Sequence, residues 1–131
     1  MTYTQEQQDS ILKEKSYAFA IRIVNMSRNL VTEEKEYILS KQVLRSGTAI
    51  GALIMESKRA ESKPDFIHKL GIALKEAEET QYWISLLKDT KLIDNKMYDS
   101  MSRDVNELVA MLVSSVNTAK ANLLKESKQQ K

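Results

Sequence analysis

The chain has 131 residues, of which 42% are hydrophobic and 29% are charged, and its formal net charge at pH 7 is +2. This length and composition indicate a single globular domain and exclude a chain that is disordered throughout. The absence of cysteine excludes disulfide bonds and thiolate metal sites, and 3 glycines and 1 proline are too few for a fold of strands and tight turns. The weak net charge differs from that of dedicated nucleic-acid-binding domains, which are usually strongly basic.

The N-terminal residues 1–9 are polar and lack the basic region and apolar run of a signal peptide. No apolar stretch of the sequence is long enough to span a bilayer. We therefore expect a cytoplasmic protein with no membrane partner.

The first predicted helix runs from about Gln5 to Leu30, after a short polar segment. Apolar residues recur through it at helical spacing, namely Tyr17, Ala20, Ile21, Ile23 and Val24. The second predicted helix runs from about Glu33 to Arg59, because Thr32 is suited to an N-cap and the acids after it suit a first turn. Its expected apolar stripe consists of Ile38, Leu39, Gln42, Val43, Ile50, Leu53 and Ile54.

The third predicted helix begins at Ser62–Asp65 and continues to about Lys88. Serine can cap a helix, proline is tolerated in the first turn, and an acid three residues after the cap fits a capping box. Asp94 is the predicted cap of the fourth helix, which continues to about Glu126. The apolar residues of these two helices keep a helical period: Phe66, Ile67, Leu70, Ala73, Leu74, Ala77, Tyr82, Trp83 and Leu87, then Val105, Leu108, Val109, Leu112, Val113, Val116 and Leu123.

Four long helices with short connections predict an all-α fold, an antiparallel up-down-up-down four-helix bundle formed by residues 1–131 as one domain. Several helices carry apolar residues outside one core-facing stripe. Such surplus apolar surface fits burial in an oligomer. It equally fits scattered surface hydrophobes, which monomers tolerate.

Gly47 and Gly51 are four residues apart and therefore share one face of the second helix. A glycine inside a helix costs about 0.5–1 kcal/mol relative to alanine, so two in succession indicate close approach of a neighbouring helix. We expect that neighbour to be the third helix. A phosphate-binding loop is disfavoured, because the glycines lack the loop and following lysine that such a site requires.

Glu76 and Glu79 are three residues apart on the third helix, among apolar neighbours. A carboxylate near a core needs a partner, and Arg45 on the second helix is the expected one. The alternative is a carboxylate-bridged dimetal site, which needs glutamates from all four helices and two Glu-x-x-His motifs. The chain has one histidine, His68, with Asp65 three residues before it, so we expect no metal and no cofactor.

His68 could act as a general base, but no nucleophile or orienting acid can be assigned to it, so a surface position is favoured. Tyr82 and Trp83 could stack a base, but their helical spacing beside leucines is more typical of core or interface residues. The sequence predicts no catalytic residue and no enzyme activity.

The C-terminal end is rich in lysine, with Lys120, Lys125, Lys128 and Lys131 against Glu126 alone. Lysines suit the negative end of a helix dipole, so this segment fits a solvated helix end. It also fits an arm that contacts phosphates.

Taken together, several segments resemble a known family: residues 42–52, Glu56–Ser57, Ser62, residues 65–67 and residues 72–83. The chain is similar in these segments to the S23, or ribosomal-RNA intervening-sequence, protein family of bacterial four-helix bundles. Some members are encoded within intervening sequences of large-subunit ribosomal RNA genes, and the accessory variability protein of diversity-generating retroelements belongs to the same group. The resemblance covers about Tyr17 to Leu123.

The resemblance implies a bundle that assembles as a ring-like homopentamer. It also implies a role with nucleic acid, since the retroelement member binds nucleic acid and its reverse transcriptase through a basic surface. The arginine of the family corresponds to Arg45, and its acids on the second and third helices correspond to Glu56, Glu76 and Glu79; these residues are expected to pair structurally. The chain departs from the family at Ala49, where serine is frequent, and at Leu53, where asparagine is frequent, which removes two polar groups.

We therefore expect a non-enzymatic, homo-oligomeric helical bundle that binds RNA, DNA or a nucleoprotein partner, with a reverse transcriptase as one candidate. The expected phosphate contacts are Arg22, Arg28, Lys120, Lys125 and Lys128. The alternative is a protein–protein interaction scaffold with no role in nucleic-acid binding.

Overall fold

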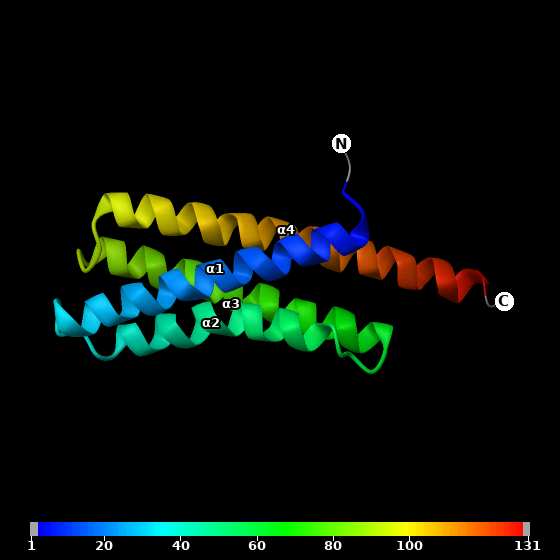
Figure 1. The fold of residues 1–131 in the computed structure, drawn as a ribbon, viewed down its shortest axis with the longest axis horizontal. Helices are drawn as coiled ribbons and strands as arrows, with labels where there is room; N and C mark the ends of the chain where they lie inside the picture. Colours follow the sequence, from blue (N-terminus) through cyan, green and yellow to red (C-terminus); the bar gives the residue numbers. More distant parts are fainter. Residues whose placement is uncertain (1–2, 130–131) are drawn as a thin grey trace.

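The computed structural model describes residues 3–129, and within them the chain forms four helices. They are α1 (Gln5–Thr32), α2 (Leu39–Ser57), α3 (Lys63–Asp89) and α4 (Asn95–Gln129). Successive helices run in opposite directions, so the predicted antiparallel up-down-up-down bundle is confirmed (Figure 1). Lys131, one of the predicted basic residues of the C-terminal end, lies outside the described residues.

Three helices begin at a side-chain cap. The Ser62 hydroxyl accepts the Asp65 N–H at 3.2 Å, and an Asp94 carboxylate oxygen accepts the Met97 N–H at 2.8 Å, so both predicted caps are confirmed. The Asp65 carboxylate accepts the Glu61 N–H at 3.1 Å. In a capping box it would instead accept the N–H of the cap residue, Ser62. Thr4 caps α1 through a reciprocal capping box with Gln7.

The predicted start of the second helix was wrong, because α2 begins at Leu39 and not at Glu33. Thr32 is the last residue of α1, and the Glu33 N–H continues its hydrogen bonding to the Asn29 carbonyl at 2.8 Å. Lys35 then adopts a positive φ of 55°, which reverses the chain. The Glu36 carboxylate accepts the Ser40 N–H at 2.9 Å. An acid therefore does bind a backbone N–H at the start of α2, but it lies later in the sequence than the predicted acids. At its other end α2 stops at Ser57, before the predicted Arg59.

The apolar stripes were only partly correct. Ile23 is buried, but Tyr17 and Ile21 on α1 are exposed, by 69% and 49%, and the core-facing row of α1 is Leu12, Ser16, Phe19, Ile23, Met26 and Leu30. The predicted stripes of the other helices also contain exposed residues, namely Ile38 just before α2, Gln42 on α2, Tyr82 on α3 and Val113 on α4. Each helix carries apolar side chains on more than one face, and periodicity alone does not tell which face meets the other helices.

The glycines of α2 pack against α1, and the expectation that they face the third helix was wrong. A Cβ built on Gly47 would lie 2.7 Å from Cγ1 of Ile23, and one on Gly51 would lie 3.4 Å from the Ser16 hydroxyl oxygen. The small residue before Gly47 does face α3, since the Thr80 hydroxyl donates to the Ser46 hydroxyl at 2.9 Å. The small-residue run therefore gives close contact on two sides of α2.

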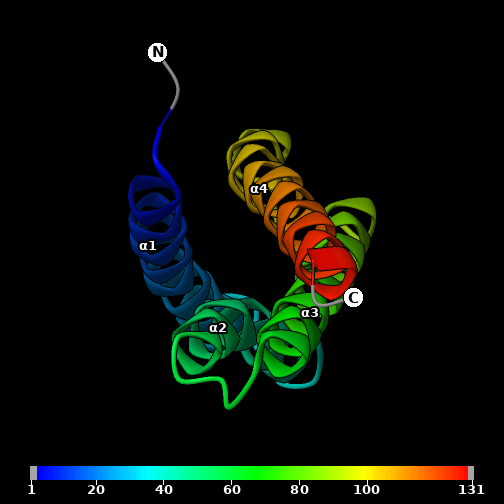
Figure 2. The same cartoon turned by 90° about the vertical axis from the view of Figure 1, so that its right-hand side faces the viewer.

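The helices are arranged in an arc in which α1 and α4 are the two ends (Figure 2). Ion pairs bridge these two helices where they cross: Lys15 with Glu107 at 2.7 Å, and Arg22 with Asp104. Away from the crossing α1 and α4 diverge, and each end of the bundle has a cleft beside them. Of the described helices, none is both long and apolar enough to cross a membrane.

Candidate nucleic-acid interface

The last turns of α4 form a basic helix end that projects beyond the start of α3 (Figure 1). Lys120, Lys125 and Lys128 are all exposed there. The acid among them, Glu126, forms an ion pair with Lys63 at the start of α3. Within residues 3–129 no carboxylate pairs with the three lysines, so their positive charge is directed to solvent.

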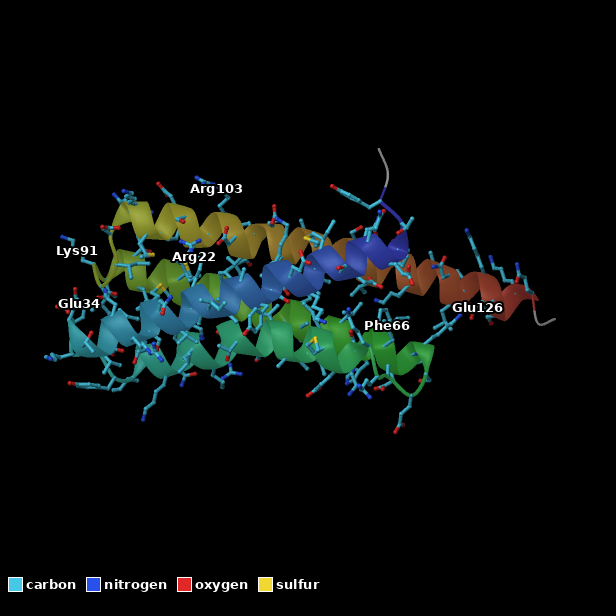
Figure 3. All side chains as sticks on the ribbon, viewed as in Figure 1. Arg22, Glu34, Phe66, Lys91, Arg103 and Glu126 are labelled. Atoms are coloured by element: carbon cyan, nitrogen blue, oxygen red, sulfur yellow. The ribbon has the colours of Figure 1, made fainter. Side chains whose placement is uncertain are left out.

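A cleft of about 390 Å³ lies beside the basic helix end, between the starts of α1 and α3 and the last turns of α4. Figure 3 shows Phe66 and Glu126 at this end of the bundle. The lining combines five uncharged polar residues, two cations, two acids and two apolar residues, of which Phe66 is aromatic: Gln5, Ser115, Thr118, Asn122, Gln129, Lys63, Lys125, Asp9, Glu126, Phe66 and Ala119. Sequence patterns did not indicate this cleft, because its walls come from three helices.

The two predicted arginine contacts lie away from the basic helix end. The Arg22 guanidinium donates to the Ser100 hydroxyl at 2.7 Å and pairs with Asp104, so it already holds α1 against α4. Arg28 is exposed near the C-terminal end of α1. Arg22 is level with Asp104 and the two helices are antiparallel, so at 1.5 Å per residue Arg28 is about 33–45 Å from the three lysines along the bundle. The structure therefore does not bring the arginines and lysines together.

A second cleft, of about 900 Å³, lies at the opposite end, between α1 and the turn from α3 to α4. It is lined by three cations, three acids and an apolar floor: Arg22, Lys88, Lys91, Glu34, Asp89, Asp94, Met26, Leu92, Ile93, Met97 and Met101, with Asn25, Asn29 and Asn95. Opposite charges in equal number make this cleft a poorer phosphate site than the basic helix end.

Near this cleft, hydrogen bonds with Ser102 and Ser85 lower the pKa of Tyr98, and the Lys88 ammonium lies 4.3 Å from the centroid of the Tyr98 ring.

Arg45 lies against both acids of α3. Its guanidinium donates to Glu76 at 2.7 Å and also pairs with Glu79. The hydrogen bond with Glu76 is the main cause that raises the pKa of Arg45. Glu56, in contrast, is exposed, and no ion pair of residues 3–129 includes it. The arginine and its two acids link α2 to α3 at the surface and satisfy one another, so Glu76 and Glu79 are not a free carboxylate pair.

The remaining candidates are dispersed. His68 is exposed, whereas Tyr82 is exposed and Trp83 is half-buried, with their rings edge to face at 5.0 Å. A search of the described residues finds no group of three or more histidines, cysteines or acids that could hold a metal ion.

The fold and this surface define a four-helix-bundle protein with one basic helix end. The model of the family described as 23S rRNA-intervening sequence protein matches residues 8–114, so the chain belongs to that family. A crystal structure of a protein of unknown function from the S23 ribosomal protein family of Bacteroides thetaiotaomicron is similar, with 50% sequence identity and a TM-score of 0.83. The match covers 84% of this chain and 98% of that chain. No match was found among curated proteins.

The family resemblance seen in the sequence is thereby confirmed. The narrower link to retroelement proteins stays a prediction.

Proposed function

We propose that this protein is a homo-oligomeric helical bundle that binds RNA or DNA through the basic helix end of α4. The observation that carries the proposal is the set of three exposed lysines, Lys120, Lys125 and Lys128, whose nearby acid is engaged by Lys63. Lysines without acidic partners are available to phosphates, and binding releases the counterions condensed on the nucleic acid. The family name, which refers to intervening sequences of 23S rRNA, supports a nucleic-acid partner.

Self-association is the second part of the proposal. The outer side of α1 and α2 presents exposed Tyr17, Ile21 and Met55 beside an apolar groove of about 530 Å³. Large side chains of this kind gathered on one face are typical of a protein interface. The family resemblance implies a ring-like homopentamer. A ring repeats the basic helix end in every protomer, which strengthens binding to a polyanion without further contacts.

The test compares two triple variants in a mobility-shift assay with a structured RNA and a DNA duplex at low salt. The first replaces Lys120, Lys125 and Lys128 by glutamine, and we expect it to weaken binding at least tenfold. The control replaces Lys41, Lys58 and Lys75 by glutamine, which removes the same charge from exposed positions on α2, its C-cap and α3. We expect little change from the control. Equal losses of affinity in the two variants would mean that binding depends only on net charge, which would refute a specific interface.

The second candidate function is a protein-interaction scaffold without a role in nucleic-acid binding. The exposed apolar face of α1 and α2 favours it, because such a face suits a protein partner. The resemblance suggests a reverse transcriptase as that partner. A complex that survives both nuclease and high salt supports the scaffold, whereas one lost on nuclease treatment supports nucleic-acid binding.

A further inference from the structure

The cleft beside the basic helix end has the chemistry of a site for one uncharged, planar, polar group. Phe66 lines it and is also partly buried against the core, so its ring is held by packing. Amides and hydroxyls make up much of the remaining wall, among them Asn122 and Gln129 on α4. An amide side chain presents a donor and an acceptor side by side. An aromatic ring beside such amides fits a heteroaromatic ring with polar edges.

Two other occupants, a bare anion and an apolar helix, fit this cleft poorly. A bare anion would lie close to the carboxylates of Asp9 and Glu126, which line the walls. An apolar helix would bury Asn122 and Gln129, and no side-chain hydrogen bond within residues 3–129 satisfies either amide. A base avoids both problems, because it is neutral and can bond to the amides while its phosphates stay at the rim.

The size and position of the cleft agree with this chemistry. Its volume of about 390 Å³ falls within the range of roughly 300–1,000 Å³ that small-molecule sites occupy. Lys125 lines the cleft, and Lys128 follows it on the same basic helix end. A strand whose phosphates contact these lysines would therefore pass directly over the opening.

We propose that this cleft takes one unpaired base of a bound single strand, stacked on Phe66 and hydrogen-bonded by Asn122 and Gln129, with the adjoining phosphates at Lys125 and Lys128. The inference rests on the proposed nucleic-acid binding and adds to it a contact that only a single-stranded segment can make. Proteins commonly recognise RNA through such splayed bases, which stack on aromatic side chains and expose their edges to polar groups.

Fluorescence anisotropy with a short single-stranded RNA, and with the same RNA annealed to its complement, tests the proposal. We expect Phe66→Leu to weaken single-strand binding about tenfold, which is the scale of one lost base–aromatic stack. Duplex binding should not change. Phe66→Tyr keeps the ring and should restore single-strand binding. Tyr82→Leu, which removes an exposed aromatic residue elsewhere on α3, should have no effect.

Asn122→Ala provides a second variant should circular dichroism show that Phe66→Leu does not fold. Asn122 is exposed on α4 and alanine is the better helix former, so the fold should persist. We expect a several-fold loss for the single strand alone. Unchanged affinity for the single strand in the folded variants, or equal losses of affinity for both RNAs, would overturn the base site. Neither result would contradict the phosphate contacts of the lysines. A wild-type protein that binds neither RNA would refute the proposed function itself.

Discussion

At the level of single residues, the contact between Gly47 and Ile23 is the closest that an added Cβ would make at any of the three glycines. A Cβ on Gly47 would lie 2.7–2.8 Å from three carbon atoms of the Ile23 side chain, which is completely buried. Gly71 on α3 has nothing within 4 Å of the equivalent position. The two glycines therefore differ in what an added methyl group would meet, although both lie inside helices.

We predict that Gly47→Ala lowers the free energy of unfolding by about 1–2 kcal/mol. Overpacking against Ile23 costs roughly 1–3 kcal/mol and outweighs the helix-propensity gain of up to about 1 kcal/mol. The matched control, Gly71→Ala, should raise stability by about 0.5–1 kcal/mol, because only the propensity term acts there. Urea denaturation followed by circular dichroism measures both changes. The same sign in both variants would show that the contact does not constrain the position.

Arg45 illustrates a residue whose role the sequence indicated well. Its position among apolar residues pointed to acids on the third helix, and Glu76 and Glu79 contact it. The Arg45 guanidinium is charged at all ordinary pH values, and its raised pKa moves any loss of that charge further into the alkaline range. The Arg45 side chain is 52% exposed, so solvent screening limits the stabilisation to about 1 kcal/mol or less.

At the scale of helices, local sequence determined the starts that have a capping side chain. Ser62 and Asp94 each occupy the first position before a helix, and both accept a backbone N–H there. The segment after Thr32 misled the prediction, because its acids resemble a first turn while α1 continues through Thr32 and a left-handed Lys35 then reverses the chain. A short run of acids therefore does not by itself mark a helix start.

We predict that Asp94→Ala destabilises the protein by about 1 kcal/mol, which is the usual loss when an N-cap side chain is removed. Its bond to the Met97 N–H has no replacement in alanine. Asp99→Ala removes an exposed acid one turn further along α4 and should cost less than about 0.5 kcal/mol. Thermal denaturation of the two variants at matched concentration makes the comparison. Equal midpoints would mean that the cap contributes nothing measurable.

At the scale of the whole molecule, sequence patterns sufficed for the bundle but not for its surfaces. Helix number, order and direction follow from periodicity and short connections. The three lysines of the basic helix end were also visible in the sequence. Their separation from Arg22 and Arg28, and the cleft lined by Phe66 and Asn122, depend on how three helices meet. Long-range packing of this kind leaves no periodic trace in a single sequence.

We predict that the wild-type protein is a homo-oligomer and that Tyr17→Glu shifts it to a smaller species. Tyr17 is 69% exposed beside the apolar groove of α1 and α2, where a charge would be buried on assembly. Tyr82→Glu serves as the control, since Tyr82 is 60% exposed on α3 and does not line that groove. Light scattering coupled to size exclusion gives the masses. A wild-type monomer would contradict self-association, and equal effects of the two variants would place the interface elsewhere.

Binding of phosphates at the basic helix end of α4 predicts a specific dependence of affinity on salt. Each neutralised phosphate contributes about 0.7–0.9 to the slope of log affinity against log salt, so three lysines predict a slope of about −2 to −3 for each engaged protomer. The affinity of the wild-type protein for a structured RNA should follow such a slope, and the variant lacking Lys120, Lys125 and Lys128 should have a shallower one. Binding that does not depend on salt, or an unchanged slope in the variant, would rule out phosphate binding at these three lysines.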